Sequence, residues 1–324
     1  MKKIVLAVLM LLPMLAEAIG LKDIRVRDPF ILADGKTQTY YLYCSSSVSH
    51  EGKTLGGVAV YWSKDLADWQ GPKQVFEVPE SNWATGLVWA PEVHQYRGKY
   101  YLFATMNSSV EWKRRDTVLP PYYLRGTQIF RADSPEGPFL PLGDKPATPE
   151  GEMCLDGTLW VEDGVPYMVY CHEWVETLDG EMRLMRLTKN LHKAAGPSSR
   201  LFCASAASWA SPLQWEGMGA EKYYVTDGPF LYRTRTGKLV MLWSSFVGSS
   251  YAVGIAESTT GRIAGPWIHQ REPLFSRDGG HGMLFRSFDG RLYVVLHSPN
   301  APSGAERAVL HEVEDVGETL RLRQ

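Results

Sequence analysis

The sequence predicts an all-β protein folded as one five-bladed β-propeller. A strand-like run, a tight turn and a second strand-like run recur five times along the 324 residues, at spacings of roughly 50–70 residues. A third strand-like run follows each pair, and the stretches between them lack helical periodicity. A sandwich or a jelly roll would not require such regular repetition, so the propeller is the favoured architecture.

Each repeat begins with an apolar strand that leads through a glycine-containing turn into a second, aromatic-rich strand. The five pairs are Asp28–Leu32 with Thr39–Tyr43, Trp89–His94 with Tyr100–Phe103, Asp156–Trp160 with Tyr167–Tyr170, Asp227–Tyr232 with Leu239–Trp243, and His281–Phe285 with Leu292–His297. The third runs are Val58–Trp62, Thr127–Ala132, Glu181–Leu187, Tyr251–Glu257 and Arg307–Val313.

Insertions follow three of the second strands, at His50–Gly56, Ser108–Leu124 and Val175–Gly180. In a propeller, the connections between second and third strands lie on the same face as the segments that enter the first strands. We therefore expect a site on this face, built from both sets of connections.

The N-terminal segment predicts export. Residues 1–18 combine two lysines at the start, an apolar run from Ile4 to Leu15 and the small-residue sequence Ala16-Glu17-Ala18, which is the pattern of a cleaved secretory signal. We expect a periplasmic or secreted protein in which residues 19–324 form a single catalytic propeller domain. The sequence does not define its oligomeric state.

Composition limits the partners. The chain has 34 Lys and Arg against 36 Asp and Glu, for a net charge of −2, which argues against nucleic acid or an anionic membrane as the main partner. Its 11 Trp and 16 Tyr are numerous. Packing in β cores accounts for most such rings, but exposed rings also suit the apolar faces of sugars. A carbohydrate partner is compatible with this composition.

The four cysteines, Cys44, Cys154, Cys171 and Cys203, show no Cys-x-x-Cys spacing. Metal binding through thiolates is therefore not expected. Buried cysteines are common in protein cores, and we expect these to be buried free thiols.

Carboxylates occupy the starts of three first strands, at Asp28, Asp156 and Asp227. A turn or capping role would be ordinary for any one of them, but equivalent positions in a ring of blades should share one pocket. Glu173 follows the second strand of the third repeat and should lie beside Asp156. Clustered acids repel, so one can stay protonated while another is ionised. Glycoside hydrolysis needs such a pair, roughly 6.5–9.5 Å apart in inverting enzymes.

Four segments resemble glycoside hydrolase family 43 along the mature chain: Arg27-Asp28-Pro29-Phe30, Trp89-Ala90-Pro91-Glu92-Val93, Asp156-Gly157-Thr158-Leu159-Trp160 and Gly280-His281-Gly282. The resemblance implies a five-bladed propeller that hydrolyses arabinofuranosyl or xylosyl linkages with inversion. It also implies that Asp28 is the general base and that Asp156 positions the general acid and tunes its pKa.

The chain departs from this family at the acid. The family usually carries Glu-Gly-Pro at the start of the fourth blade, whereas this chain has Thr226-Asp227-Gly228-Pro229. Aspartate is one methylene shorter than glutamate, so Asp227 would need a closer substrate or backbone. Glu173 is the alternative acid and is favoured for its length, and a lost or altered activity is a third option.

The remaining candidates are a histidine and several aromatic residues. The resemblance suggests a central cation or water cluster near His281, but a hydrogen-bonded structural histidine fits equally well. Ca²⁺ needs several oxygen ligands, so we expect no required cofactor and leave a structural Ca²⁺ near the axis open. Trp89 and Trp174 are candidates for stacking on sugar, with core packing as the alternative, whereas Trp83 and Glu92 are expected to be structural.

These observations predict a glycoside hydrolase acting on plant-type pentose polymers or oligosaccharides, as an α-L-arabinofuranosidase or arabinanase. β-Xylosidase activity is the alternative within this class. A non-catalytic carbohydrate-binding propeller is the alternative outside it, since binding alone would use the aromatic residues without Asp28.

Overall fold

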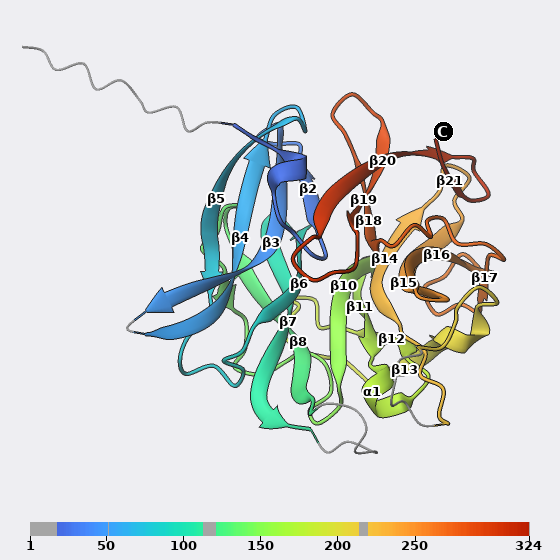
Figure 1. Cartoon of the computed structure of the whole chain (residues 1–324), viewed down its shortest axis with the longest axis horizontal. Coiled ribbons are helices and arrows are strands. Elements are labelled where there is room, and N and C mark those ends of the chain that lie inside the picture. The colour runs from blue at the N-terminus through green and yellow to red at the C-terminus, as the bar shows by residue number, and fades with distance from the viewer. Residues whose placement is uncertain (1–17, 51, 113–120, 214–219, 324) are drawn as a thin grey trace, which may run out of the picture.

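The computed structural model describes residues 18–50, 52–112, 121–213 and 220–323, and it confirms the five-bladed β-propeller (Figure 1). Five antiparallel sheets follow one another around a ring in chain order, one for each predicted repeat. The first strands of neighbouring blades contact one another all the way around, so they surround the axis. Residues 1–17, which hold nearly all of the predicted signal segment, lie outside the described residues.

Each predicted strand overlaps a strand of the structure. Blade I contains β1 (Ile19–Gly20), β2 (Phe30–Asp34), β3 (Thr39–His50), β4 (Lys53–Ser63) and β5 (Asp68–Glu77). Blade II contains β6 (Val88–Tyr96), β7 (Lys99–Glu111), β8 (Tyr123–Ala132) and β9 (Leu140–Pro141). Blade III contains β10 (Cys154–Glu162), β11 (Val165–His172), β12 (Glu181–Arg186) and β13 (Ser199–Cys203).

The last two blades are built in the same way. Blade IV contains β14 (Asp227–Arg233), β15 (Leu239–Val247), β16 (Ser250–Ser258) and β17 (Trp267–His269). Blade V contains β18 (Gly280–Arg286), β19 (Leu292–Ser298), β20 (Arg307–Asp315) and β21 (Leu320–Leu322). The helical segments are short: η1 (Leu21–Asp23), α1 (Trp174–Thr177) and η2 (Ala204–Ala206). Within the described ranges, no helix could span a lipid bilayer.

Two of the predicted insertions contain secondary structure. In the first, the described residues on either side of residue 51 belong to a long hairpin, because β3 and β4 stay paired from Tyr40 and Ser63 out to His50 and Lys53, and this hairpin projects from the ring (Figure 1). The segment Val175–Gly180 contains most of α1. In the third insertion, β7 ends at Glu111 and β8 begins at Tyr123, and residues 113–120 lie outside the described part.

The apolar core lies between neighbouring blades. Four clusters of buried side chains each join adjacent blades: one joins blades V, I and II, and the others join II with III, III with IV, and IV with V. This packing between neighbouring sheets holds the ring of blades together. The cysteines form no disulfide, and Cys44, Cys154 and Cys171 are buried, as predicted, while Cys203 is half-buried.

The first and last blades meet without exchanging strands. Blade V consists entirely of C-terminal strands, and β1 adds to the outer edge of blade I. Polar contacts add to the apolar cluster at this join: the Val26 N–H donates to the Glu306 carbonyl at 3.4 Å, and the Arg27 guanidinium lies 3.3 Å from the Glu306 carboxylate. Glu306 is buried, so this ion pair ties the segment before Asp28 to blade V.

His269 on β17 makes stability depend on pH. Both of its ring nitrogens are buried without a hydrogen-bond partner among the described residues, and its ring packs edge-on against Phe202 and Trp243 at 4.6 and 5.3 Å. Burial lowers the pKa of His269 from 6.5 to about 4. The unfolded chain therefore binds a proton that the folded chain does not, and stability falls as the pH drops from 6.5 towards 4.

Replacing His269 with phenylalanine should raise the free energy of unfolding at pH 5 by about 2 kcal/mol more than at pH 8, because the proton-linked penalty is removed. Urea unfolding at both pH values measures this difference. His192→Gln, at an exposed position, is the matched control. An unchanged pH dependence in His269→Phe would show that the buried ring does not titrate as described.

Candidate active site

A cavity of about 690 Å³ opens where the first strands begin, and all five blades line it. Its walls come from the starts of first strands and from the connections between second and third strands, as the sequence predicted. The lining includes Asp28 and Ser45–Ser47 from blade I, Trp89 and Arg125 from blade II, Asp156, Glu173 and Trp174 from blade III, Asp227 and Tyr251 from blade IV, and His281 and Glu306 from blade V.

The same backbone kink recurs at the start of the first strand in every blade and orients the side chains there. The equivalent residues of the five blades all have positive φ, between 42° and 55°: Asp28, Ala90, Asp156, Gly228 and His281. In blades II to V a bulge in the pairing of the first two strands lies at this point. Positive φ is uncommon outside glycine, and strained residues of this kind gather at functional sites.

The predicted equivalence of Asp227 with Asp28 and Asp156 is wrong by one residue. Gly228 holds the kinked position in blade IV, and Asp227 precedes it, still paired with Ser244. Asp227 therefore enters the cavity from a different backbone position, although all three carboxylates lie in the same pocket. The bulge cannot be read from residue types, because Asp-Gly and Asp-Pro are equally compatible with a kink at the aspartate.

Asp28 lies between two imidazole rings. Nδ1 of His281 and Nδ1 of His297 are each 3.2 Å from Asp28 Oδ1, and the Asp28 N–H donates to His297 Nδ1 at 3.2 Å. Burial raises the pKa of Asp28, but the two histidines and Arg27 outweigh it and hold that pKa below its usual range. Asp28 is therefore ionised at neutral pH.

Asp156 and Asp227 both line the cavity, and each accepts a hydrogen bond from a residue of blade IV. Asp156 Oδ2 accepts the Gly228 N–H at 3.0 Å, and Asp227 Oδ2 accepts the Tyr251 hydroxyl at 2.9 Å. Burial raises the pKa of Asp156, and the negative charges of Asp227 and Asp28 raise it well above its usual range. Burial also raises the pKa of Asp227, against the opposing effects of His281 and Tyr251. Asp156 therefore holds its proton more tightly than a solvent-exposed aspartate does.

The backbone of Glu173 is fixed by its neighbours. Its N–H donates to the Met153 carbonyl at 2.8 Å, and its own carbonyl accepts the N–H groups of Glu176 and Thr177, the last two residues of α1. One turn along, Glu176 Oε2 lies 2.8 Å from His172 Nε2 and accepts the Met153 N–H at 2.7 Å. The backbone N–H and carbonyl of Met153 thus tie α1 and the residue before it to the start of β10, which carries Asp156.

The carboxyl group of Glu173 is buried beside a cation. Arg125 Nε lies 3.5 Å from Glu173 Oε2, which has no hydrogen-bond partner among the described residues. Burial raises the pKa of Glu173 to about 7, even though the Arg125 charge lowers it, and the nearby Asp227 charge adds to the rise. Glu173 is therefore protonated over much of the range in which Asp28 is ionised.

Aromatic rings from blades II and III line the cavity. The Trp89 side chain, 36% exposed, has the Arg125 guanidinium over its ring at 4.4 Å. Trp174 packs edge-on against Tyr122 and Tyr223, with ring centroids 6.0 and 5.6 Å apart. Both tryptophans line the cavity, as expected for sugar-stacking candidates.

Trp83 and Glu92 have structural contacts, as expected. The Trp83 indole N–H donates to Gln128 Oε1 at 2.9 Å, and the ring packs against the core cluster that joins blades V, I and II. Glu92 is buried, with Oε2 2.8 Å from His94 Nε2. Neither lines the 690 Å³ cavity.

Comparison with known proteins identifies the family. The sequence profile of Glycosyl hydrolases family 43 matches residues 21–323. The chain belongs to this family.

Individual relatives agree with that assignment. The crystal structure of an endo-arabinase from Bacteroides thetaiotaomicron is 40% identical, with a TM-score of 0.80 over 92% of this chain and 98% of that one. An extracellular exo-α-(1→5)-L-arabinofuranosidase from Cellvibrio japonicus is 23% identical over 88% of this chain and 82% of its own length. An endo-1,4-β-xylanase from Bacteroides thetaiotaomicron, 21% identical with a TM-score of 0.68 over 92% and 94% of the two chains, shares the fold.

His281 of this family 43 chain lines the cavity and lies beside two carboxylates. Its Nδ1 is 3.2 Å from Asp28 Oδ1 and 3.8 Å from Asp156 Oδ2. Ca²⁺ takes roughly six to eight oxygen ligands, and over the described part of the chain no three His, Cys, Asp or Glu side chains are arranged to hold a metal ion. These groups do not by themselves fit a Ca²⁺ site, and a cofactor-free enzyme stays a prediction.

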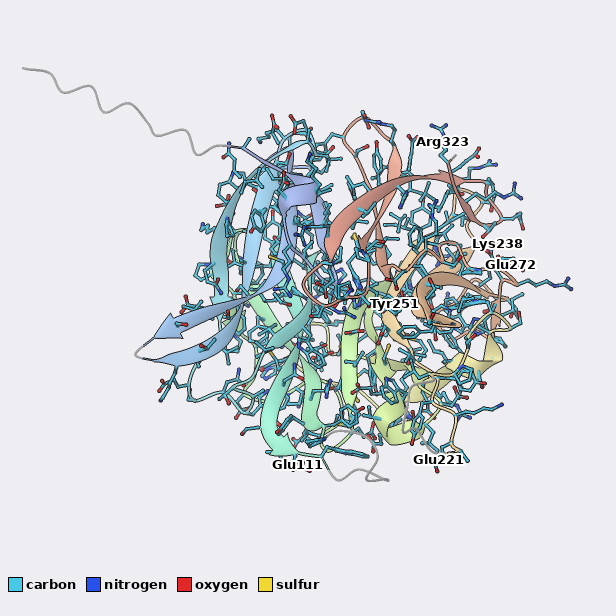
Figure 2. All side chains as sticks on the ribbon, viewed as in Figure 1. Glu111, Glu221, Lys238, Tyr251, Glu272 and Arg323 are labelled. Atoms are coloured by element: carbon cyan, nitrogen blue, oxygen red, sulfur yellow. The ribbon has the colours of Figure 1, made fainter. Side chains whose placement is uncertain are left out.

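Sequence reasoning missed three polar groups of the site. Arg125 and Tyr251 stand on third strands, and His297 ends a second strand, whereas the search concentrated on the starts of first strands. Tyr251 lies near the centre of the ring (Figure 2), where its ring stacks on His297 with centroids 5.5 Å apart. Their positions along the strands could have revealed them, because each of these three residues lies where its strand meets the face already predicted to carry the site.

Difference infrared spectra of the wild type and Glu173→Gln should reveal a carboxyl group that titrates near pH 7, because burial raises the pKa of Glu173 to about 7. In a protein that carries Asp227→Asn and keeps Glu173, the titration midpoint of Glu173 should be lower, because the substitution removes a negative charge that raises the pKa of Glu173. The exposed Glu150→Gln serves as the control. A midpoint below pH 5 would contradict the described burial of Glu173.

Proposed function

We propose that this protein is an exported, inverting glycoside hydrolase that cleaves α-L-arabinofuranosyl linkages in arabinan or its oligosaccharides. The observation that carries the proposal is one cavity lined by both an ionised carboxylate, Asp28, and a carboxyl group whose pKa is raised to about 7, Glu173. Inverting hydrolysis requires this combination of base and acid.

The substrate and the location rest on the relatives. The 40% identical structure is that of an endo-arabinase, and the Cellvibrio japonicus relative is named an extracellular exo-α-(1→5)-L-arabinofuranosidase. The secretory pattern of residues 1–18 supports export independently. The aromatic walls at Trp89 and Trp174 suit the apolar faces of sugar rings.

In this mechanism, Asp28 accepts a proton from a water molecule as that water attacks the anomeric carbon. Glu173 donates its proton to the glycosidic oxygen, so the C–O bond breaks on the opposite side of the sugar from the attack. After one turnover Asp28 is protonated and Glu173 is ionised, and exchange with solvent restores both. His281 and His297 keep Asp28 ionised in the resting enzyme.

Asp156 supports this chemistry through position and charge. By accepting the Gly228 N–H it holds the start of β14, and with it Asp227, against blade III. Asp227 is the alternative acid, since burial raises its pKa as well. Its carboxyl group already accepts the Tyr251 hydroxyl, whereas Glu173 Oε2 has no such partner among the described residues, which favours Glu173.

Asp28→Asn should lower kcat on aryl arabinofuranosides and arabinan roughly 10²–10⁴-fold, because the general base is lost. The exposed Asp144→Asn is the matched control and should keep wild-type rates. The panel includes aryl xylosides to test the alternative sugar. Sugar binding without hydrolysis by the wild type would favour the non-catalytic propeller, and equal turnover by Asp28→Asn would exclude Asp28 as the base.

Glu173→Gln and Asp227→Asn should differ in how they respond to the leaving group. Loss of the acid slows poor leaving groups strongly and good ones little, because an activated aryl oxide departs without protonation. Glu173→Gln should therefore lose activity on arabino-oligosaccharides and retain most of it on a dinitrophenyl arabinofuranoside. The same selective pattern in Asp227→Asn alone would assign the acid to Asp227.

A further inference from the structure

Arg125 stands between two functional groups of the cavity. It lies on β8 with its side chain only 6% exposed, yet it lines the cavity. Its guanidinium carbon is 4.4 Å from the centre of the Trp89 ring, and its Nε is 3.5 Å from Glu173 Oε2. One cation thus contacts both a wall for sugar binding and the proposed acid.

We propose that Arg125 is a positioning residue that holds the Trp89 indole as a sugar-binding wall and adjusts the readiness of Glu173 to release its proton. This inference rests on the proposed function, in which Glu173 is the general acid. It deepens that function by giving one residue of blade II a role in both substrate affinity and the pH range of activity.

The contact with Trp89 explains how an exposed ring is held in place. The backbone leading into β6 is anchored, because the Gly86 N–H donates to the Asn107 carbonyl and Asn107 Nδ2 donates to the Leu87 carbonyl. The indole itself lies with the guanidinium over its ring. A planar guanidinium stacks on an aromatic ring in a way that a lysine ammonium does not reproduce.

The contact with Glu173 sets the balance of charge on the acid. The other titratable groups that act on Glu173 are Asp227 and Glu176, which favour its protonated form, and His172, which opposes it. Arg125 is the largest of the charge effects that favour ionisation. Without this cation, burial and the neighbouring acids would hold the proton more tightly, and proton donation to the leaving oxygen would be harder.

Two substitutions separate these effects. Arg125→Met removes both the positive charge and the planar guanidinium group. Because the planar group no longer stacks on Trp89, KM for arabino-oligosaccharides should rise about tenfold. Because the charge beside Glu173 is lost, the alkaline limb of the pH profile of activity should move up by about one pH unit. Arg125→Lys restores the charge alone, so the limb should return towards the wild type while KM stays raised. Arg131→Met, at an exposed position of β8, is the control for folding and should change neither.

Two further measurements make the outcomes decisive. In a Trp89→Ala background, Arg125→Met should add little to KM, because the ring that it holds is gone. The infrared midpoint of Glu173 should rise above 7 in Arg125→Met, whether or not the variant is active. If the infrared midpoint of Glu173 shifts in Arg125→Met but the alkaline limb of the activity profile does not, the contact between Arg125 and Glu173 is supported and Glu173 is overturned as the general acid. An unshifted midpoint, or a Lys variant identical to the Met variant in both readouts, would overturn the proposal for Arg125.

Discussion

Repulsion among buried carboxyl groups is the constraint that shapes this protein. Asp28, Asp156, Glu173 and Asp227 line one cavity and are largely removed from water, so four negative charges there would be costly. The structure meets this constraint differently for each group. Two imidazoles keep Asp28 ionised, burial raises the pKa of Asp156 and of Asp227, and burial opposed by one guanidinium holds the pKa of Glu173 near neutrality. Acid and base thus arise from a single electrostatic balance.

The backbone makes this crowding possible. A residue of positive φ recurs at the start of the first strand in every blade, and three of the five are Asp28, Asp156 and His281. Packing between neighbouring blades holds these kinks in place, since the apolar clusters join adjacent sheets all around the ring. The strain is therefore supported by the whole propeller, and the polar groups converge where the first strands begin.

In this family 43 chain, residues next to the carboxyl groups of the cavity hold those groups in position. Met153 ties α1 to β10 and so fixes the backbone of Glu173, while His297 contacts both the backbone and the carboxylate of Asp28. Tyr251 connects the two halves of the site, because it donates to Asp227 and stacks on His297. His297 comes from a different blade from Asp28, whereas Tyr251 and Asp227 stand on different strands of blade IV.

The sequence alone determined the propeller, because strand periodicity and glycine turns are local properties that recur with each repeat. It also placed Asp28, Asp156 and Glu173 on one face, since the start of a first strand and the end of a second strand follow directly from that periodicity. The one-residue offset of Asp227 and the partners Arg125, Tyr251 and His297 were decided by the tertiary structure. A bulge depends on pairing with another strand, and a pKa depends on charges from other blades, so neither is written in local residue patterns.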